Sequence, residues 1–406
     1  MSAQAGRVEK ALTEDRTSVD VERAESRSAP VSVRSLKLTG FRNYARQSLD
    51  LDGRAVVLFG ENGAGKTNLL EAVSLLAPGR GLRRAKTADL ERCRADSAET
   101  GPVSGWGVAA TLATAVGPIE VGTGNDAGSD RRIVRINGAA ATQASLSEYV
   151  SAVWLTPQMS QLFLEGSSAR RRFLDRLVYG FDPAHAGRVT AYEKALRDRS
   201  RVLKDGAGSA DAGWLDALEA QIADRGVAIA AVRLDMAVRL ARVASVGFGP
   251  FPGATIAVSG DLETWLDTGS AVAVEDRFRE ALVQNRPADA VTGGAAVGVH
   301  RSDLLVRHVE KDMPADQCST GEQKALLMAL VLSHARLLTA ERGVTPLLLL
   351  DEVAAHLDED RREALFSALL EMGAQAWMTG TDARVFAPMQ GKAQIFNVAD
   401  AAVSAV

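Results

Sequence analysis

The feature that most constrains the fold of this chain is a glycine-rich octapeptide, Gly60-Glu61-Asn62-Gly63-Ala64-Gly65-Lys66-Thr67, which fits G-x-x-x-x-G-K-[S/T] in full. The apolar run 55–59 precedes it, as expected of a strand buried on both faces of a sheet, and a helix is predicted from Lys66. Glycines let the backbone curl so that its N–H groups surround an anion, and the helix N-terminus adds positive potential. The strand–loop–helix context argues against a chance glycine turn and predicts a phosphate-binding loop.

A second element turns phosphate binding into a hypothesis of nucleotide hydrolysis. In the loop, Lys66 is expected to contact the β- and γ-phosphates, and the Thr67 hydroxyl is expected to ligate Mg²⁺. The buried strand predicted at 346–350 delivers Asp351 to support the metal and Glu352 to polarise an attacking water as general base. Alone, such a strand is as often structural as functional. Together with the loop, it predicts an ATP and Mg²⁺ site divided between two distant parts of the chain.

A third motif, Ser319-Thr320-Gly321-Glu322, lies at the start of an apolar helix expected at 321–340. A serine N-cap would explain the motif on its own. Serine and glycine at a helix N-terminus also offer free N–H donors to a phosphate, and the motif precedes Asp351 by about thirty residues, as an ABC signature does. One chain does not need two phosphate-binding helix ends, whereas a dimer does. We therefore expect an ATP-dependent homodimer, with each Ser319 segment facing the partner's loop.

Composition indicates an ordinary globular protein and leaves little room for other classes. The 406 residues are 46% apolar and 24% charged with a net charge of −4, so any nucleic-acid surface must be local. The two cysteines form neither a disulfide framework nor a metal motif, which favours a reducing cytosol. The apolar runs of the C-terminal half are too short for a membrane helix. We expect a cytoplasmic protein without a membrane partner.

The pattern of elements divides the chain into four parts. Two helical stripes, 182–203 and 215–236, are joined by a glycine-rich stretch and predict an antiparallel hairpin, although two ordinary globular helices fit the pattern equally well. Short alternating runs between 106 and 136 predict antiparallel strands. The predicted parts are a disordered tail (1–30), an N-terminal ATPase lobe (31–166), a helical arm (167–297) and a C-terminal ATPase lobe (298–406).

Further motifs make the sequence similar to the RecF family, the SMC-like ABC ATPases of bacterial recombinational repair. The resemblance covers about residues 31–398 and leaves only the tail outside. It rests on Phe41–Tyr44, on the phosphate loop followed by Asn68–Ala72, on Pro78–Arg84, on Gly166–Asp175 with its three successive arginines, on Gly298–Leu304, and on Ser319–Lys324 with Asp351-Glu352.

The resemblance implies an α/β fold: an SMC-like ABC ATPase head with a split nucleotide-binding fold and an inserted helical arm resembling a short coiled coil. It implies ATP-dependent dimerisation on double-stranded and gapped DNA, with slow, DNA-dependent hydrolysis. It also implies work with RecO and RecR to load RecA at single-strand gaps, in DNA replication, recombinational repair and the SOS response.

Site residues follow by position from the same resemblance. Ser319 would contact the γ-phosphate in trans, and Asp358 would be a dimer-contacting D-loop residue. Gln158 is the implied sensor of the γ-phosphate. Two positions depart from the common pattern. Glu322 replaces a glutamine, which suits the SMC branch. No histidine occupies the switch segment 377–382, where Thr379 or Thr381 is the candidate substitute. Further nucleotide contacts are expected from Arg42, Asn43 and Asn68.

Basic segments are the candidates for DNA contact. Arg80, Arg83, Arg84 and Lys86 follow a Pro-Gly break and form the denser cluster. The arginine run 170–172 is the weaker candidate, because a charge run is more often a solvated helix face.

Three other classes compete with this hypothesis. The ATPase subunit of an ABC transporter would be a compact cassette without an inserted hairpin. A small GTPase or kinase would leave Ser319–Glu322 unexplained, and the chain has no Asn-Lys-x-Asp guanine motif. A long-armed SMC tether fails on length, because two helices of about 25 residues reach only ~40 Å.

Overall fold

A six-stranded, mostly parallel sheet forms the centre of the head in the computed structural model, which describes residues 29–92, 105–126, 129–205, 212–354 and 357–406. The strand order is β17-β16-β4-β15-β14-β9, and only β17 runs antiparallel to its neighbour. Both ends of the chain build this one sheet, so the predicted split nucleotide-binding fold is confirmed. The strands are β4 (Ala55–Phe59), β9 (Ala152–Leu155), β14 (Leu347–Leu350), β15 (Ala376–Gly380), β16 (Ala393–Ala399) and β17 (Ala402–Ala405).

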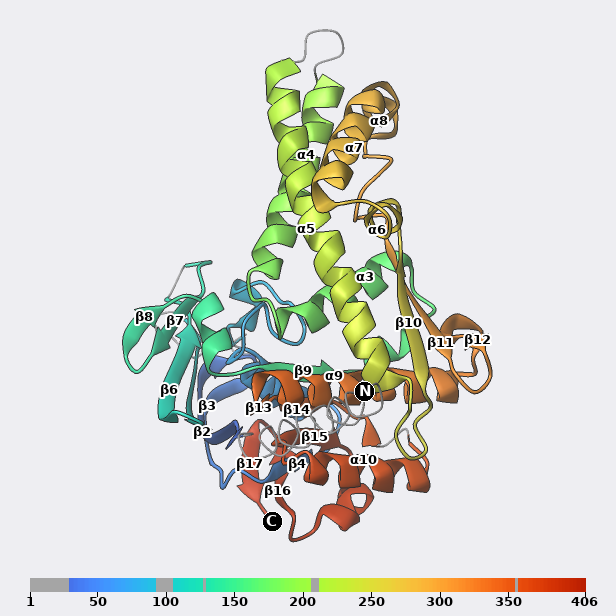
Figure 1. The fold of residues 1–406 in the computed structure, drawn as a ribbon. Coiled ribbons are helices and arrows are strands. Elements are labelled where there is room, and N and C mark those ends of the chain that lie inside the picture. The colour runs from blue at the N-terminus through green and yellow to red at the C-terminus, as the bar shows by residue number, and fades with distance from the viewer. Residues whose placement is uncertain (1–28, 93–104, 127–128, 206–211, 355–356) are drawn as a thin grey trace, which may run out of the picture.

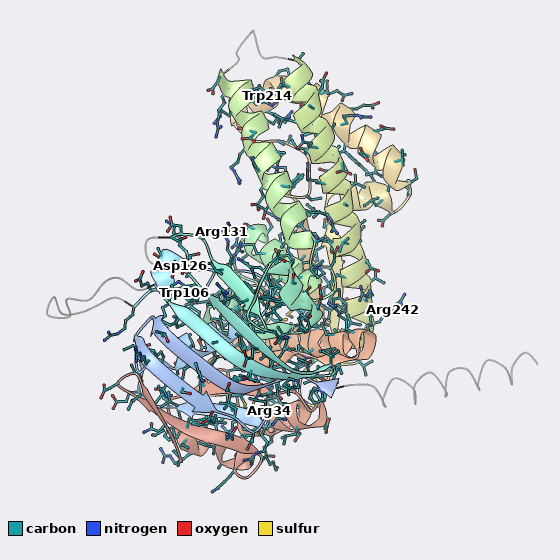
Figure 2. All side chains as sticks on the ribbon, turned by 90° about the vertical axis from the view of Figure 1, so that its left-hand side faces the viewer. Arg34, Trp106, Asp126, Arg131, Trp214 and Arg242 are labelled. Atoms are coloured by element: carbon teal, nitrogen blue, oxygen red, sulfur yellow. The ribbon has the colours of Figure 1, made fainter. Side chains whose placement is uncertain are left out.

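An antiparallel sheet packs beside the parallel one, with helix α2 (Lys66–Ser74) between them. Its strand order is β3-β2-β5-β6-β7-β8, and it contains the strands predicted between 106 and 136. Figure 2 shows this sheet along the side of the head, with Trp106 at its border. The strands are β2 (Ser32–Phe41), β3 (Tyr44–Asp50), β5 (Gly107–Thr114), β6 (Gly117–Gly124), β7 (Ile133–Ile136) and β8 (Ala139–Ala141).

Helices α9 (Thr320–Arg342) and α10 (Glu359–Glu371) cover the other face of the parallel sheet. Helix α9 is buried on most of its circumference, as expected of a helix that is apolar all round. Helix α9 lies where the sequence predicts it, within two residues at each end. Short 3₁₀ turns complete the head: η1 (Ala88–Leu90), η2 (Ala144–Glu148), η3 (Pro157–Gln161), η4 (Ala315–Gln317) and η6 (Ala383–Met389).

A helical arm rises from the head, with α4 (His185–Asp205) and α5 (Ala212–Ala244) side by side (Figure 1). The predicted antiparallel hairpin is therefore present. At 33 residues, α5 is ~50 Å long, more than the sequence estimate. It begins before the predicted stripe, at Ala212, and continues beyond residue 236 to Ala244. Figure 2 shows Trp214 at the far end of the arm. The other arm helices are α3 (Ser167–Tyr179), α6 (Asp261–Leu266), α7 (Ala271–Gln284) and α8 (Arg286–Thr292).

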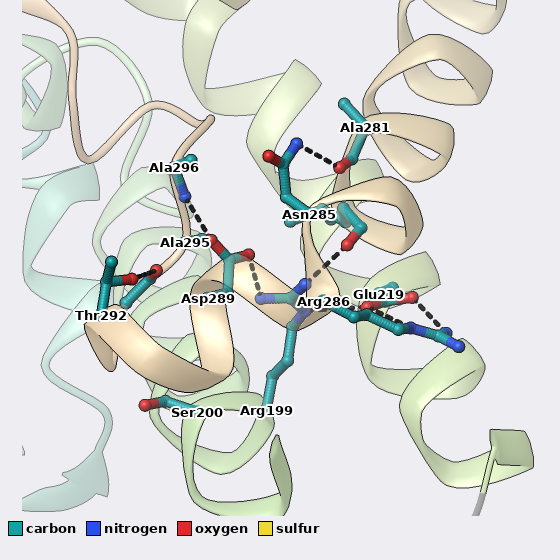
Figure 3. Close-up of polar contacts among 12 residues, drawn as sticks. Arg199, Ser200, Glu219, Ala281, Asn285, Arg286, Asp289, Thr292, Ala295 and Ala296 are labelled. Atoms are coloured by element: carbon teal, nitrogen blue, oxygen red, sulfur yellow. Dashed lines mark hydrogen bonds and ion pairs between the residues drawn. The ribbon is translucent and has the colours of Figure 1, made fainter. Parts of the chain in front are cut away.

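A buried ion-pair network braces the hairpin against α7 and α8 (Figure 3). Arg199 of α4 is 1% exposed and donates to Glu219 of α5 and to Asp289 of α8, each at 2.8 Å. Its remaining nitrogen donates to the Leu282 carbonyl at 2.7 Å. Arg286 also pairs with Glu219. The hairpin is thus packed against two further helices rather than standing as a bare pair.

Two small sheets pair strands from segments that the sequence analysis places in different parts of the chain. Strands β10 (Ala254–Ser259), β11 (Asp303–His308) and β12 (Met313–Pro314) form one antiparallel sheet. The β10–β11 pairing crosses the predicted boundary at 297/298, and the division into domains stays a prediction.

The residues that the structure describes begin before the predicted end of the tail. Strand β1 (Ala29–Pro30) pairs in parallel with β13 (Val344–Thr345), although both of its residues were expected to be disordered. Residues 1–28 and Cys93 lie outside the described residues. Within the described ranges, no helix is long and apolar enough to cross a membrane.

Candidate nucleotide site

The glycine-rich loop leaves the carboxyl end of β4 and enters α2 in the conformation that phosphate binding requires. Gly60, Gly63 and Gly65 have φ values of 150°, 84° and 117°, where side chains are rarely tolerated. A Cβ atom on Gly60 would lie 2.1 Å from the Val398 carbonyl oxygen, and one on Gly65 would lie 2.5 Å from the Asn43 amide nitrogen. Only glycine fits at these two positions, which explains the spacing of the motif.

Lys66 is folded over the loop and almost fully buried. Its ammonium donates to the carbonyl oxygens of Gly60 at 2.7 Å and Glu61 at 2.8 Å. An ammonium has three donors, so one remains for a phosphate oxygen. Burial lowers the pKa of Lys66, and the negative charges of Glu352 and Asp351 partly oppose that shift. The lysine therefore faces the two acids predicted to complete the site.

The hydroxyl of Thr67 and the carboxylate of Asp351 meet, although they lie 284 positions apart in the sequence. Thr67 Oγ1 donates to Asp351 Oδ1 at 3.0 Å, and Thr379 Oγ1 donates to the same oxygen at 2.8 Å. The reason is topological: β15 lies between β4 and β14, and parallel strands end at the same edge of the sheet. That edge collects the phosphate loop and both acids.

Glu352 follows Asp351 in a left-handed conformation, with φ at 54°. Its N–H donates to Thr379 Oγ1 at 2.8 Å. Thr379 thus connects the predicted metal support and the backbone of the predicted general base. The sequence singled out Thr379 only as a substitute for a missing histidine, and its bridging contact was not foreseen.

The donor set fits Mg²⁺ that arrives with a nucleotide. Thr67 and Asp351 supply neighbouring oxygens of the hard type that Mg²⁺ prefers, and phosphate oxygens and water commonly complete its octahedral shell. Among the described residues, no group of three His, Cys, Asp or Glu side chains could hold a metal by itself. The residues suit a shared protein–nucleotide site rather than an all-protein one.

Arg42, Asn43 and Asn68 support the loop through side-chain contacts. Asn68 donates to Asn43 at 2.8 Å, and Asn43 donates to the carbonyl of Ala64 at 3.2 Å. Arg42 makes a two-pronged pair with the buried Glu71 of α2, with both distances 2.8 Å. Direct contact of these three residues with a nucleotide stays a prediction.

Two supporting residues were missed by the sequence reasoning. Tyr44 donates its hydroxyl to the carbonyl of Gly65 at 3.1 Å. Glu71 accepts from Arg42 while only 1% exposed. An acid within an otherwise apolar helix was the available signal for Glu71, since a buried carboxylate requires a cationic partner.

Gln158 lies in η3, just after β9, at the same edge of the sheet as Asp351. Its side chain is exposed. A hollow beside Asp351 is lined by Thr156 and Pro157 of this segment and by Lys324 of α9. The structure places Gln158 near the predicted site, and its role as a sensor stays a prediction.

The Ser319–Glu322 motif forms the N-terminal cap of α9, as expected of a serine N-cap. Ser319 is the N-cap residue, and its hydroxyl accepts from the Glu322 N–H while the Glu322 carboxylate accepts from the Ser319 N–H. Ser319, Thr320 and Gly321 are all exposed. Among the described contacts, none joins this motif to the phosphate loop of the same chain. The helix end therefore remains accessible to a second molecule.

Asp358 is the N-cap residue of α10 and accepts from the Arg361 N–H at 2.9 Å. Ala355 and His356 of the same predicted D-loop segment lie outside the described residues. A dimer contact by Asp358 stays a prediction.

The basic segment after α2 is exposed and faces the base of the arm. Arg80, Arg83 and Arg84 line a groove together with Arg172 and Arg176 of α3. Arg83 also donates to Asn68 at 2.7 Å, which connects this segment with the support of the phosphate loop. Lys86 is exposed beside the groove and lines a separate hollow with Arg80.

The arginine run of α3 divides between structural contacts and the groove. Arg170 makes a two-pronged pair with Asp303, and Arg171 donates to the Ser302 carbonyl. Arg172 is exposed. The interpretation of this run as a solvated face therefore holds for only one of the three side chains.

Comparison with known proteins agrees with this architecture. The family model for the RecF/RecN/SMC N terminal domain matches residues 32–404. DNA replication and repair protein RecF of Mesorhizobium japonicum is 52% identical over 375 residues, which cover 91% of this chain and 97% of that protein. The chain belongs to the RecF family. The RecF protein of Brucella suis is 49% identical over 380 residues, covering 92% and 96% of the two chains.

Solved structures show the same fold. The recombination mediator protein RecF-ATPrS in the RecFOR pathway aligns with a TM-score of 0.82 and 22% identity, covering 93% of this chain and 99% of that one. The Smc head domain of Pyrococcus furiosus bound to ScpA aligns with a TM-score of 0.52 and 17% identity, covering 93% and 96%. The SMC-like ABC ATPase fold is therefore confirmed. With its complete phosphate loop, this RecF-family chain is an ATP-binding ATPase rather than a transporter subunit.

Proposed function

We propose that this RecF-family protein is a DNA-dependent ATPase that closes as a dimer on double-stranded DNA when it binds ATP. The observation that carries the proposal is the division of phosphate-binding parts between two places. The loop at 60–67 meets Asp351 within one chain, whereas Ser319 caps a separate, exposed helix end. A second chain can bring its Ser319 to the first chain's loop, and ATP would then be held between them.

ATP shifts the population toward the dimer because the closed state adds contacts to the γ-phosphate. Lys66 neutralises phosphate charge in each loop, and Thr67 with Asp351 would hold Mg²⁺, which supplies further charge neutralisation when bound. Glu352 accepts a proton from the attacking water. Loss of the bridging γ-phosphate then removes the contacts to Ser319, and the dimer opens.

DNA binding is assigned to the groove between Arg80–Arg84 and α3. The support is local charge: five arginines line the groove together with one acid, Glu165, although the whole chain is acidic. Phosphate contacts release counterions, so affinity for DNA should fall steeply with salt despite the net charge of −4. Closure of the dimer would place two such grooves on one composite surface.

The resemblance and the names of the relatives extend the proposal to a pathway. We assign this chain a role with RecO and RecR in loading RecA at single-strand gaps, in the cytoplasm. The relatives named DNA replication and repair protein RecF match this chain over nearly their whole length, so we expect this chain to act in the same process.

The test is the molecular mass in solution with Mg²⁺ and ATP, with and without gapped DNA. Wild type should be monomeric without ATP and dimeric with it, and the dimer should retain DNA. Glu352→Gln should prolong the dimer, because it removes the general base but keeps the side-chain shape. Ser319→Arg should prevent dimerisation while ATP still binds to the monomer. A wild-type chain that stays monomeric with ATP would refute the clamp.

A further inference from the structure

Lys311 lies against the carboxylate that caps the exposed end of α9. It belongs to the turn between β11 and β12, which leads through η4 directly to Ser319. Its ammonium donates to one oxygen of Glu322, while the other oxygen accepts from the Ser319 N–H at 2.9 Å. Neither the motif pattern nor the family resemblance pointed to Lys311.

The turn is fixed so that Lys311 keeps this position. Arg307 on β11 reaches across the turn to Asp312, with 2.8 Å to the carboxylate and 2.6 Å to the carbonyl oxygen. Asp312 adopts a left-handed conformation with φ at 44°, which tightens the turn. The hairpin therefore places the backbone of Lys311 near the start of α9, where its side chain contacts Glu322.

Glu322 creates an electrostatic difficulty for the proposed dimer. Its carboxylate is bound at the helix end where a partner's γ-phosphate would be received, and like charges repel across an interface. Lys311 is the cation that contacts this carboxylate. A glutamate is ionised at neutral pH, and the hydrogen bond from Lys311 is the main reason that the pKa of Glu322 falls further, to about 2.

We propose that Lys311 is a positioning residue for the ATP-bridged dimer, which neutralises Glu322 so that the Ser319 helix end can accept the partner's γ-phosphate. This inference rests on the proposed function. Lys311 lets the chain retain a glutamate that caps α9 without repelling ATP. It acts through Glu322 and does not itself contact the nucleotide.

A double-mutant cycle tests the proposal, with the dimer dissociation constant in Mg²⁺ and ATP as the readout. Lys311→Met should weaken the dimer about tenfold, because Glu322 would then face the phosphate without a countercharge. Glu322→Gln keeps the capping pattern and removes the charge. In that background Lys311→Met should change the dimer constant less than about twofold, since no carboxylate remains to be neutralised.

Controls separate this role from folding and from general charge. Lys311→Arg should restore the dimer, and Lys392→Met should have no effect, because Lys392 is exposed at the opposite edge of the sheet. ATP affinity of the monomer should be equal in all variants. The difference between Lys311→Met and wild type should shrink as salt rises, since exposed charges are screened.

Each result has a definite meaning. An unchanged dimer constant in Lys311→Met would overturn the inference while leaving the clamp intact. Equal weakening in both backgrounds would also overturn it, because Lys311 would then act directly rather than through Glu322. Wild type that fails to dimerise with ATP would refute the proposed function and the inference with it.

Discussion

Replacement of Thr379 by valine tests whether one hydroxyl organises the hydrolytic site. Thr379 is 1% exposed, and its Oγ1 donates to Asp351 at 2.8 Å and accepts from the Glu352 N–H at 2.8 Å. Valine has nearly the same volume and suits a strand, so the sheet should tolerate it. The substitution removes the hydroxyl that donates to the buried Asp351 carboxylate and accepts from the Glu352 N–H.

The magnitude follows from the removal of these two hydrogen bonds. Leaving a buried polar group without its partner costs about 1–3 kcal/mol. Glu352 also adopts a left-handed backbone with φ at 54°, a conformation that costs about 1–2 kcal/mol and persists only where surrounding contacts impose it. Without the hydroxyl, the general base should lose its orientation. A loss of ~1.4–3 kcal/mol in the transition state corresponds to a fall in kcat of roughly 10- to 100-fold.

The assay is steady-state ATP hydrolysis with saturating duplex DNA, combined with equilibrium ATP binding. Affinity for ATP should change little, because no hydrogen bond among the described residues joins Thr379 directly to the loop or to Lys66. Thr379→Ser keeps the hydroxyl and should retain most of the activity. Hydrolysis at the wild-type rate in Thr379→Val would refute the reasoning, and an equal loss in Thr379→Ser would assign the effect to packing instead.

Three further predictions concern the arm, a buried histidine and the groove. Arg199→Met should destabilise the arm by about 3–5 kcal/mol in urea unfolding, because it leaves the buried Asp289 carboxylate without its cation. The exposed Arg197→Met should cost less than about 0.5 kcal/mol. Burial lowers the pKa of His334 to about 4, and the neutral ring donates to the Leu177 carbonyl. Its contribution to stability is complete above pH 6.5 and is lost as pH falls toward 4, so wild type should lose up to about 3 kcal/mol more than His334→Gln over that range in unfolding experiments at each pH. Arg172→Met should reduce the slope of log affinity for duplex DNA against log salt by about 0.9 for each DNA phosphate that Arg172 neutralises, and an unchanged slope would remove Arg172 from the DNA surface.

The sequence predicted the parts of the site that local chemistry determines. Gly60, Gly63 and Gly65 need positive φ values, and glycine is the residue type that supplies them without strain. The apolar run at 347–350 is a central strand because it is buried on both faces. The phosphate loop together with a buried strand ending in acids was enough to predict Asp351 beside Thr67, and parallel strands that end at one edge bring the two together.

Contacts between distant segments could not be predicted in the same way. The pairs of Arg42 with Glu71 and of Arg170 with Asp303 depend on how two elements pack, and the sequence around one partner does not identify the other. Arg170 shows the difficulty: its sequence neighbours suggested a basic helix face, but β11 supplies a carboxylate 133 residues later. Hydropathy patterns do not carry that information.

The same strand, β11, connects the arm to the exposed end of α9. It begins at Asp303, which Arg170 of α3 holds with two hydrogen bonds, and it ends in the turn that carries Lys311. At the base of the arm, Asp175 of α3 binds Arg233 of α5 and His185 of α4 in a buried cluster. The arm, β11 and the Ser319 helix end are therefore joined by short contacts, which are buried at the arm base, part-buried at Asp303 and exposed at Lys311. A substitution at the arm base should consequently be measured for ATP-dependent dimerisation as well as for stability.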